Sequence, residues 1–418
     1  MVPKGWTLGT LNDLADTIMG YAFRSEDFVP TGIPLVRMGN LYQNSLDLNR
    51  NPVYLPDSFK VDYKRFLVKP GDLVMSMTGT MGKRDYGFTV EIPSNTQYSL
   101  LNQRVLKIVP KNNSSSGYIL NLLRSELILS VLYSFPGGTK QANLSAKQVQ
   151  ELPVLIPPLA EQKKIAEILS IWDKAISVTQ KFLANSQQQK KALMQQLLTG
   201  KKRLLDENGT RFSETWKLYA LSKLFQRVTT KNNGKSNNVV TISGQHGLIK
   251  QEDFFKKTVA SDTLDGYFLL KKGQFAYNKS YSNGYPMGAI KRLNRYPEGV
   301  VTTLYICFEL TTPKKSCGDY WEHYFESGLL NNSLSQIAHE GGRAHGLLNV
   351  KPSDFFSLKV AVPGFEEQQK IASVLSAADT EISTLEKKLA CLKDEKKALM
   401  QQLLTGKRRV KVDEAVAV

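Results

Sequence analysis

The chain has 418 residues, 41% of them hydrophobic and 22% charged, and its 55 Lys and Arg against 38 Asp and Glu give a formal net charge of +17. That length suggests two or three globular units, and the apolar content excludes a disordered chain. No apolar run approaches the ~20 residues that span a bilayer, residues 1–6 lack the pattern of a signal peptide, and the 3 cysteines are too few for a disulfide framework. We therefore expect a cytoplasmic protein without membrane contact, and the positive charge, spread along the chain, favours a polyanionic partner.

The first region, residues 1–156, has the pattern of an α+β domain. Short apolar runs predict strands at residues 34–38, 72–77 and 103–109. Clusters of Pro, Gly, Asn and Ser separate these runs, as turn segments do. A longer stretch rich in apolar residues, from Gly117 to Ser134, predicts a helix.

Residues 157–203 predict a long helix. From Ile165 to Leu197, apolar residues recur at every third and fourth position, which is the spacing of a coiled-coil seam, and no Pro or Gly interrupts them. Gly200 follows as a candidate C-cap, and the cations of residues 201–203 lie where they interact favourably with a helix C-terminus. About 40 residues at 1.5 Å per residue give a rod of roughly 60 Å.

The second half of the chain repeats this order. Residues 204–362 again predict an α+β domain, with strands at 238–242, 273–277 and 300–306 and a helix near 319–339. Residues 363–410 predict a second long helix, followed by a tail at 411–418. This helix has an apolar seam from Ile371 to Leu403, and Gly406 is its candidate C-cap.

The two helical regions are copies of one another. Residues 190–201 recur without change as residues 396–407, an offset of 206 positions. A weaker similarity links Trp6 and Leu8 to Trp216 and Leu218 near the starts of the two variable regions. Before this identical stretch, further residues match at the same offset of 206: Glu161 with Glu367, Gln162 with Gln368, and Asp173 with Asp379. The chain therefore alternates variable and shared segments, so that two unlike regions share one framework.

An apolar stripe along a rod has to be buried against something. If the two repeated helices pack through equivalent faces, the contact is isologous and a two-fold axis relates them. With that axis perpendicular to the rods, the helices are antiparallel and the variable regions lie at opposite ends. The alternative is that each helix packs only on its own domain.

No motif predicts catalysis. Gly82-Lys83 lacks the earlier glycine of a Walker A loop, because Met77 occupies that position. Residues 51–54 differ from the Asn-Pro-Pro-Tyr loop of base methyltransferases at Val53, and the 4 histidines have no zinc-binding spacing. The sequence favours a binding protein over an enzyme, with no cofactor or metal bound by this chain.

Polar loops in both variable regions carry groups suited to nucleic acid. Residues 78–84 offer backbone amides and two cations for phosphate, and residues 98–104 offer amide and guanidinium groups that read A and G edges. The polar loop 136–143 has its positional equivalent at 341–346, and residues 278–283 follow a strand as residues 78–84 do. The candidate DNA-contacting residues are Arg37, Asn40, Thr78, Lys83, Arg84, Tyr98, Gln103, Arg104, Lys140, Gln141, Gln245, His246, Asn278, Lys279, Tyr281, Arg343 and His345.

Residues 156–166 and 362–372 resemble the entry to the conserved helices of type I restriction–modification specificity subunits. The repeated Leu-Met-Gln-Gln-Leu-Leu-Thr-Gly-Lys tails are similar to that family too, as are residues 32–40 and 78–83. The resemblance covers essentially the whole chain. The second variable region departs from it, because residues 240–244 replace the first motif and no Thr-Gly-Thr-x-Gly-Lys occurs there.

This resemblance implies a fold and a function. The fold is α+β, with two target-recognition domains at 1–156 and 204–362, separated by two long antiparallel helices at 157–203 and 363–410 in a pseudo-two-fold repeat. Each domain would read one half of a bipartite site in double-stranded DNA, and the helices would set the spacer and dock two modification subunits. The chain itself would be non-catalytic. S-adenosylmethionine would bind to the modification subunits, and ATP and Mg to the restriction subunits.

Two other functions stay open at this point. The chain could be a stand-alone enzyme such as a DNA methyltransferase, which methyl transfer by the purified chain would establish. It could also be a scaffold whose variable regions bind proteins, which would show as co-purifying partners without DNA-dependent activity.

Overall fold

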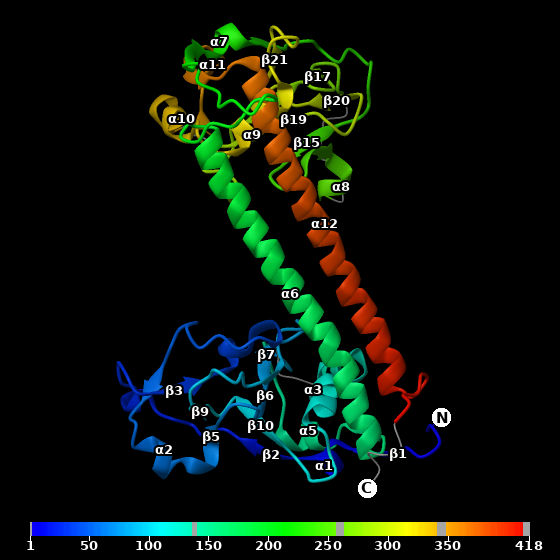
Figure 1. Ribbon diagram of the computed structural model, residues 1–418. Coiled ribbons are helices and arrows are strands. Elements are labelled where there is room, and N and C mark those ends of the chain that lie inside the picture. The colour runs from blue at the N-terminus through cyan, green and yellow to red at the C-terminus, as the bar shows by residue number, and fades with distance from the viewer. Residues whose placement is uncertain (1, 136–139, 256–262, 341–347, 413–418) are drawn as a thin grey trace. The chain divides into compact units, whose positions relative to one another are not determined.

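A computed structural model describes residues 2–135, 140–255, 263–340 and 348–412 of the chain. The chain forms two compact units, of which unit 1 comprises Met1–Gln180 with Lys387–Val418 and unit 2 comprises Lys181–Glu386. The division falls within the two long helices, α6 (Leu159–Leu197) and α12 (Phe365–Leu404), and not at their ends (Figure 1). Each unit therefore combines a segment of both helices with one α+β head, which we call head 1 (residues 2–156) and head 2 (residues 204–362).

Head 1 is built on an antiparallel four-stranded sheet in the order β2-β10-β6-β8. Its strands are β2 (Ala15–Met19), β10 (Val105–Pro110), β6 (Leu73–Ser76) and β8 (Thr89–Glu91). Helices α3 (Ser116–Arg124) and α4 (Glu126–Ser134) share one apolar core with this sheet, in which Leu122 and Leu132 lie with Leu73 and Leu106.

A second sheet of head 1 has the order β4-β3-β9-β5, with β3 and β9 parallel and the outer pairs antiparallel. Its strands are β3 (Ile33–Val36), β4 (Tyr54–Leu55), β5 (Leu67–Val68) and β9 (Ser99–Leu101). Two further pairs are β1 (Thr7–Thr10) with β12 (Pro153–Ile156) and β7 (Thr78–Thr80) with β11 (Gln141–Asn143). The short helices are α1 (Leu11–Leu14), α2 (Phe59–Asp62) and α5 (Ala146–Gln150), with 3-10 turns at Ser25–Asp27, Met38–Asn44 and Lys64–Phe66.

Head 2 repeats the main sheet of head 1 with different side chains. Its four strands have the order β14-β21-β18-β19, which corresponds to β2-β10-β6-β8, and the pair β13-β24 corresponds to β1-β12. These strands are β13 (Lys217–Ala220), β14 (Phe225–Arg227), β18 (Phe275–Asn278), β19 (Ala289–Arg292), β21 (Ile306–Leu310) and β24 (Lys359–Val362). Helix α9 (Gly318–Glu326) packs on this sheet, and Phe225, Phe275 and Trp321 form the centre of its aromatic core. The repeat therefore extends from the helices into the frames of both heads.

The remaining elements of head 2 are three two-stranded pairs and four short helices. Strands β15 (Val240–Ser243) and β16 (Gly247–Lys250) pair with each other, as do β17 (Phe268–Lys271) and β20 (Glu298–Val301), and β22 (His339–Glu340) with β23 (Leu348–Asn349). The other helices are α7 (Leu221–Leu224), α8 (Gln251–Phe255), α10 (Asn331–Ile337) and α11 (Pro352–Ser357).

Two helices predicted as continuous are interrupted. The helix expected from Gly117 to Ser134 divides at Ser125, whose backbone is extended (ψ 149°) and which caps the start of α4. The helix expected near 319–339 ends at Glu326, and Gly328 adopts a φ of +74° before α10 begins. The strand expected at 300–306 also divides, because β20 ends at Val301 and β21 begins at Ile306. A bend or turn interrupts the chain at each of the three places, although the local apolar pattern favours a continuous element.

The two predicted long helices are confirmed. None of the positions in either apolar seam is exposed, and the polar seam residues Thr179, Ser186 and Lys396 are buried with the rest. Gly200 and Gly406 have φ values of +70° and +66°, the left-handed conformation in which glycine ends a helix. Within the residues that the structure describes, no helix combines the length and the hydropathy of a membrane span.

In each unit the two helix segments run antiparallel. In unit 1, the start of α6 lies by the residues after α12, where Glu161 pairs with Arg409, and Asp173 further along α6 pairs with Lys396 further back on α12. In unit 2, Lys190 pairs with Asp379 and Arg203 pairs with Glu367, again in opposite chain directions. The expected helix-on-helix packing therefore exists in both units, and the helix segments also share the cores of the heads.

Candidate nucleic-acid interface

The β7–β11 ribbon of head 1 brings two of the predicted polar loops together. Thr80 lies opposite Gln141, and Thr78 lies opposite Asn143. The backbone pairing extends past the strands at both ends, because Met81 N–H donates to Lys140 O at 3.2 Å and Leu144 N–H donates to Met77 O at 2.8 Å. We call residues 77–81 with 140–144 the head 1 ribbon.

The turn that follows β7 is held by its own hydrogen bonds. The carboxylate of Asp85 accepts the backbone N–H of Thr80 at 2.7 Å, and Lys83 N–H donates to Thr80 O at 3.0 Å. A Cβ on Gly79 would lie 2.3 Å from Asp85 Oδ1, so the close approach requires glycine. Gly82 completes the turn with a φ of +76°. The turn is therefore preorganised and does not depend on a ligand for its shape.

The two cations of this turn, Lys83 and Arg84, differ in their contacts with neighbouring side chains. Lys83 is exposed and forms no close ion pair with the described residues, although its charge acts on nearby Asp85. Arg84 is exposed but donates to Glu126 at 2.9 Å and lies over the ring of Tyr133, 5.0 Å from its centroid. Lys83 is accordingly the freer phosphate contact of the two.

Three further candidates of head 1 are exposed, and two of them border the head 1 ribbon. Arg104 O accepts the N–H of Met77 at 3.0 Å, so residues 103 and 104 lie beside the start of the ribbon. The side chains of Gln103 and Arg104 are exposed, and Tyr98 is 50% exposed.

Other candidates serve the internal structure of head 1. Asn40 is 3% exposed and donates to the carbonyl oxygens of Asp47 and Arg50, and Arg37 donates to Asn51 O at 2.5 Å. These contacts fix the loop 37–51. Thr78, which lies opposite Asn143 in the ribbon, is only 4% exposed.

In head 2, the candidates after β18 lie in an equivalent place. Leu348 N–H donates to Lys279 O at 3.0 Å, as Leu144 does to Met77 in head 1. Tyr281 is 62% exposed, and the side chain of Asn278 accepts the N–H of Ser280 at 3.1 Å. Burial, and then the nearby charge of Arg227, lowers the pKa of Lys279. Arg343 and His345 lie outside the described residues.

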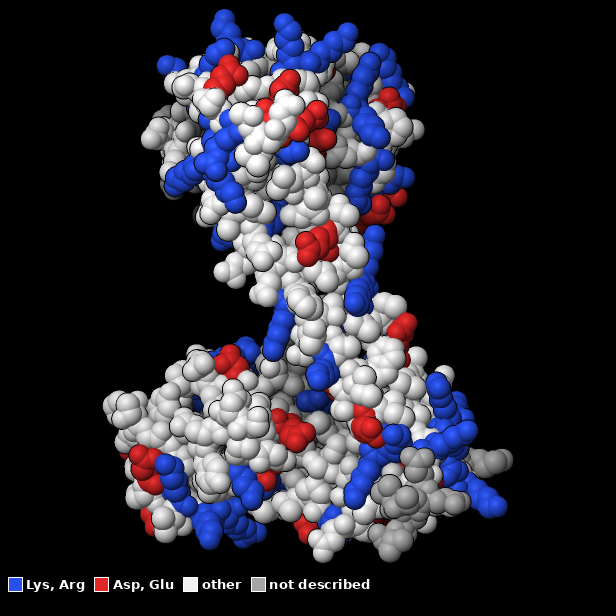
Figure 2. All heavy atoms as spheres, viewed as in Figure 1, with Lys and Arg blue, Asp and Glu red and all other residues white. Residues whose placement is uncertain are grey.

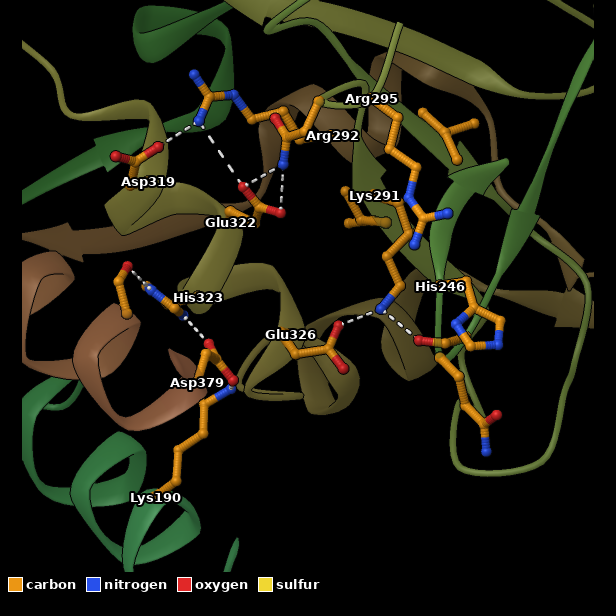
Figure 3. A pocket seen from close by; sticks show the side chains of 17 residues that line it. Lys190, His246, Lys291, Arg292, Arg295, Asp319, Glu322, His323, Glu326 and Asp379 are labelled. Carbon is orange, nitrogen blue, oxygen red and sulfur yellow. Dashed lines mark hydrogen bonds and ion pairs between the residues drawn. The ribbon is translucent and has the colours of Figure 1, made fainter. Parts of the chain in front are cut away.

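Gln245 and His246, both exposed, lie in the β15–β16 turn at the rim of a pocket of about 410 Å³ within unit 2 (Figure 3). Most charges in this pocket are paired. Lys291 donates to Glu326 at 2.5 Å and to Gly244 O at 2.8 Å, while Arg292 pairs with Asp319 at 2.5 Å. Arg295 is exposed and has no acidic partner among the described residues. The paired charges fix the turn to α9, and the rim residues stay open to solvent.

His323 lies on the opposite wall of this pocket. It is 7% exposed, and its Nε2 lies 2.9 Å from Ser376 Oγ. Burial lowers the pKa of His323, and the charge of Lys190 adds to this effect, while Asp379, Asp319 and Glu326 oppose it. Nδ1 of the ring lies 3.7 Å from Asp379 Oδ2, so His323 links α9 to α12 through both ring nitrogens (Figure 3).

Sequence reasoning missed a repeated clamp formed by Trp, Glu and Arg. In unit 1, Glu161 accepts hydrogen bonds from Trp6 Nε1 at 3.1 Å and from Arg409. In unit 2, Glu367 accepts from Trp216 Nε1 at 3.0 Å and from both Nε and Nη2 of Arg203, at 2.6 and 2.7 Å. The signal was present in the sequence, because all three residue types recur in the second copy.

The clamp ties three distant segments together in each unit. The tryptophan comes from the start of the head, the glutamate from the start of one long helix, and the arginine from just beyond the end of the other. Each head is thereby fixed to both helices at the same relative place, although the loops of the two heads differ.

Lys and Arg are distributed over both units among Asp and Glu, with no single dominant patch on the face that Figure 2 shows. No group of His, Cys, Asp and Glu within the described part of the chain could hold a metal ion. The geometry of the exposed loops suits contacts from many scattered side chains to a phosphate backbone.

The chain is similar to known proteins along most of its length. Residues 3–185 match the family model of the type I restriction modification DNA specificity domain. The chain is 24% identical to a putative type I restriction enzyme MjaX specificity subunit of Methanocaldococcus jannaschii, over 98% of this chain and 95% of that protein. It is 22% identical to the type I restriction enzyme EcoKI specificity subunit of Escherichia coli, over 93% of this chain and 85% of that protein.

Solved structures with the same fold include the S subunit of a type I restriction–modification system from M. genitalium. It superimposes with a TM-score of 0.58 at 13% identity, over 96% of both chains. A chain from a study of the assembly and conformational transition of the type I R-M system superimposes with a TM-score of 0.55 at 14% identity, over 98% of this chain and 100% of that one.

Proposed function

The chain belongs to the type I restriction–modification specificity subunits, and from this premise we propose that it is the DNA-recognition subunit of such a complex. Each head reads one half of a split sequence in double-stranded DNA. The paired helices set the spacer between the halves and dock two modification subunits.

One observation carries this proposal: the framework contacts of the two units are the same, while the exposed loops differ. The clamp around Glu161 recurs around Glu367, and the Lys396–Asp173 pair recurs as Lys190–Asp379. A repeated frame with different loops suits two readers that must be held alike but recognise different sequences.

The chemistry is assigned to partner subunits in this proposal. The modification subunits bind S-adenosylmethionine and methylate adenine, and the restriction subunits use ATP and Mg. This chain contributes sequence recognition without catalysis and acts in the cytoplasm, where it binds the host DNA. The chain aligns with specificity subunits over most of its own length and most of theirs. A stand-alone methyltransferase or a protein-binding scaffold is therefore not favoured.

Methylome sequencing of a host with and without this gene tests the proposal. We expect a split adenine-methylated motif that disappears when the gene is deleted and returns with the gene on a plasmid. A methylome that does not change on deletion, in a host that expresses the modification subunit, would refute the proposal.

A further inference from the structure

The outward face of the head 1 ribbon carries two amide side chains with no internal role. Gln141 and Asn143 are exposed, whereas Ala142 between them is 4% exposed. Within the described residues, neither amide has a hydrogen-bond partner. By contrast, the amides of Asn40 and Gln162 bond to backbone carbonyl oxygens of their own unit. These two ribbon amides are therefore available to a ligand.

The ribbon holds the two amides in a defined register. Because alternate residues of a strand point to the same side, Gln141 and Asn143 project to the side of Thr80 and Thr78, which lie opposite them on the partner strand. Two residues at about 3.3–3.4 Å each separate the amides by roughly 6.7 Å along the strand. Base pairs stack at about 3.4 Å, so the two amides match positions two base-pair steps apart.

The surroundings of the ribbon suit the major groove of DNA. A two-stranded ribbon fits the width of that groove, and Gln and Asn form bidentate hydrogen bonds to N6 and N7 of adenine there. Lys140 and Lys83, both exposed, flank the amides and supply cations for the adjacent phosphates. The turn after β7 is already ordered by Asp85, which reduces the entropy lost when the ribbon binds.

We propose that the head 1 ribbon enters the major groove and that Gln141 and Asn143 each read an adenine in one half of the split site. This proposal rests on the proposed function and adds to it the reading element, the groove and the base. The corresponding strand of head 2 falls within residues 341–347, outside the described residues, so the proposal concerns head 1 alone.

Three variants of the full chain, co-expressed with its modification subunits, test the assignment: Gln141→Ala, Asn143→Ala and Gln141→Glu. The readout is the adenine methylome of the host. We expect each alanine variant to relax one position in one half of the motif, with a loss of discrimination of roughly 5- to 150-fold, and to leave the other half unchanged. Gln141→Glu should shift that position away from adenine and toward cytosine, whose N4 amino group donates to a carboxylate.

Asn12→Ala is the matched control. Asn12 is an exposed amide on α1, at the end of the main sheet opposite the ribbon, because it precedes Ala15 of β2 whereas the ribbon adjoins the Met19 end. This variant should leave the motif intact. Purification of each variant with its modification subunits, and its thermal midpoint, check that the fold is retained.

The outcomes separate the two proposals. If the wild-type chain directs a split motif and all three ribbon variants keep it unchanged, the ribbon assignment is wrong and the proposed function stands. If Gln141→Ala unfolds the chain, the amide is structural and the assignment is also wrong. If the wild-type chain directs no motif, both proposals fail together.

Discussion

Lys396 on α12 donates to Asp173 on α6 at 2.6 Å, and this ion pair joins the two long helices inside unit 1. The side chain of Lys396 is only 11% exposed, whereas that of Asp173 is 43% exposed. The equivalent pair, Lys190 with Asp379, joins the same helices in unit 2 at 2.5 Å. Loss of the counter-charge should therefore be more costly for the buried ammonium of Lys396 than for the more exposed carboxylate of Asp173.

That asymmetry predicts unequal effects of removing either partner. Asp173→Asn should lower the free energy of unfolding by about 1–3 kcal/mol, because it leaves the ammonium of Lys396 buried without a counter-charge. Lys396→Met should cost less, because an apolar side chain of similar length fits the seam and the remaining acid faces solvent. Urea unfolding of the two variants measures this difference, and equal losses would contradict the prediction.

The Trp-Glu-Arg clamps should differ in strength between the units. The carboxylate of Glu367 is 3% exposed, so Arg203→Ala leaves a buried charge and should destabilise the protein by about 3–5 kcal/mol. In unit 1 the side chain of Glu161 is 12% exposed and that of Arg409 is 41% exposed, so Arg409→Ala leaves a less buried charge and should cost less, about 1–3 kcal/mol. Thermal unfolding of both variants tests this order. A larger loss for Arg409→Ala would show that burial does not set the strength of the clamps.

His323 predicts a dependence of stability on pH. Its pKa in the folded chain is lowered from the usual value, so between the folded and unfolded pKa values the unfolded state binds more protons. The contribution of the neutral ring is therefore present above about pH 6.5 and is lost as the pH falls below that value. The thermal midpoint should fall between pH 7.5 and pH 5.5 more in the wild type than in His323→Asn.

Asparagine is the suitable replacement because it occupies the corresponding helix position in head 1. Asn121 holds the sixth position of α3, as His323 does in α9, and both helices have nine residues. If His323→Asn showed the same pH dependence as the wild type, another group would be responsible for it.

Removal of Lys83 should change the salt dependence of DNA binding in the same way for every DNA sequence. Lys83→Ala should weaken binding of the assembled complex to all duplexes alike and reduce the slope of log affinity against log salt concentration by about 1. Lys69→Ala is the control, because this exposed lysine precedes β6, at the end opposite the ribbon. Titrations at several salt concentrations compare the two slopes. A larger effect at Lys69 would place the DNA elsewhere on head 1.

The spacer should respond to helix length. One heptad inserted after Gln180 in α6 and another after Glu386 in α12, at the boundary of the two units, would add about 10 Å to each helix and nearly preserve its rotational phase. The methylated motif should then keep both halves and have a spacer longer by up to about three base pairs. An unchanged spacer would show that the helices do not set it.

The helices and the repeat could be predicted from the sequence because their signals are local and periodic. The seam from Ile371 to Leu403 and the glycine at 406 define a helix without reference to the rest of the fold. The break at Ser125 could not be predicted in this way, because α4 turns back over the sheet only through tertiary packing of Ile128 and Leu132. The signal at Gly328 was visible, but the apolar pattern on both sides of it favoured a continuous helix.

The candidate site, too, could be predicted from the sequence only in part. Polar loops were identifiable by composition, but their free and engaged members were not. Asn40 and Gln141 look alike in sequence, yet the first is buried in hydrogen bonds of its own loop and the second is exposed on a ribbon. The partners of Glu161 and Glu367 come from segments more than 150 positions away, so only the fold brings them together.

Recognition of a split site by two heads can be measured as the affinity of the assembled complex for a duplex that carries the identified motif and for duplexes in which one half is scrambled. At physiological salt, we expect tight binding only when both halves are intact, and a large loss of affinity when either half alone is scrambled. Equal affinity for the intact and the scrambled duplexes would contradict it.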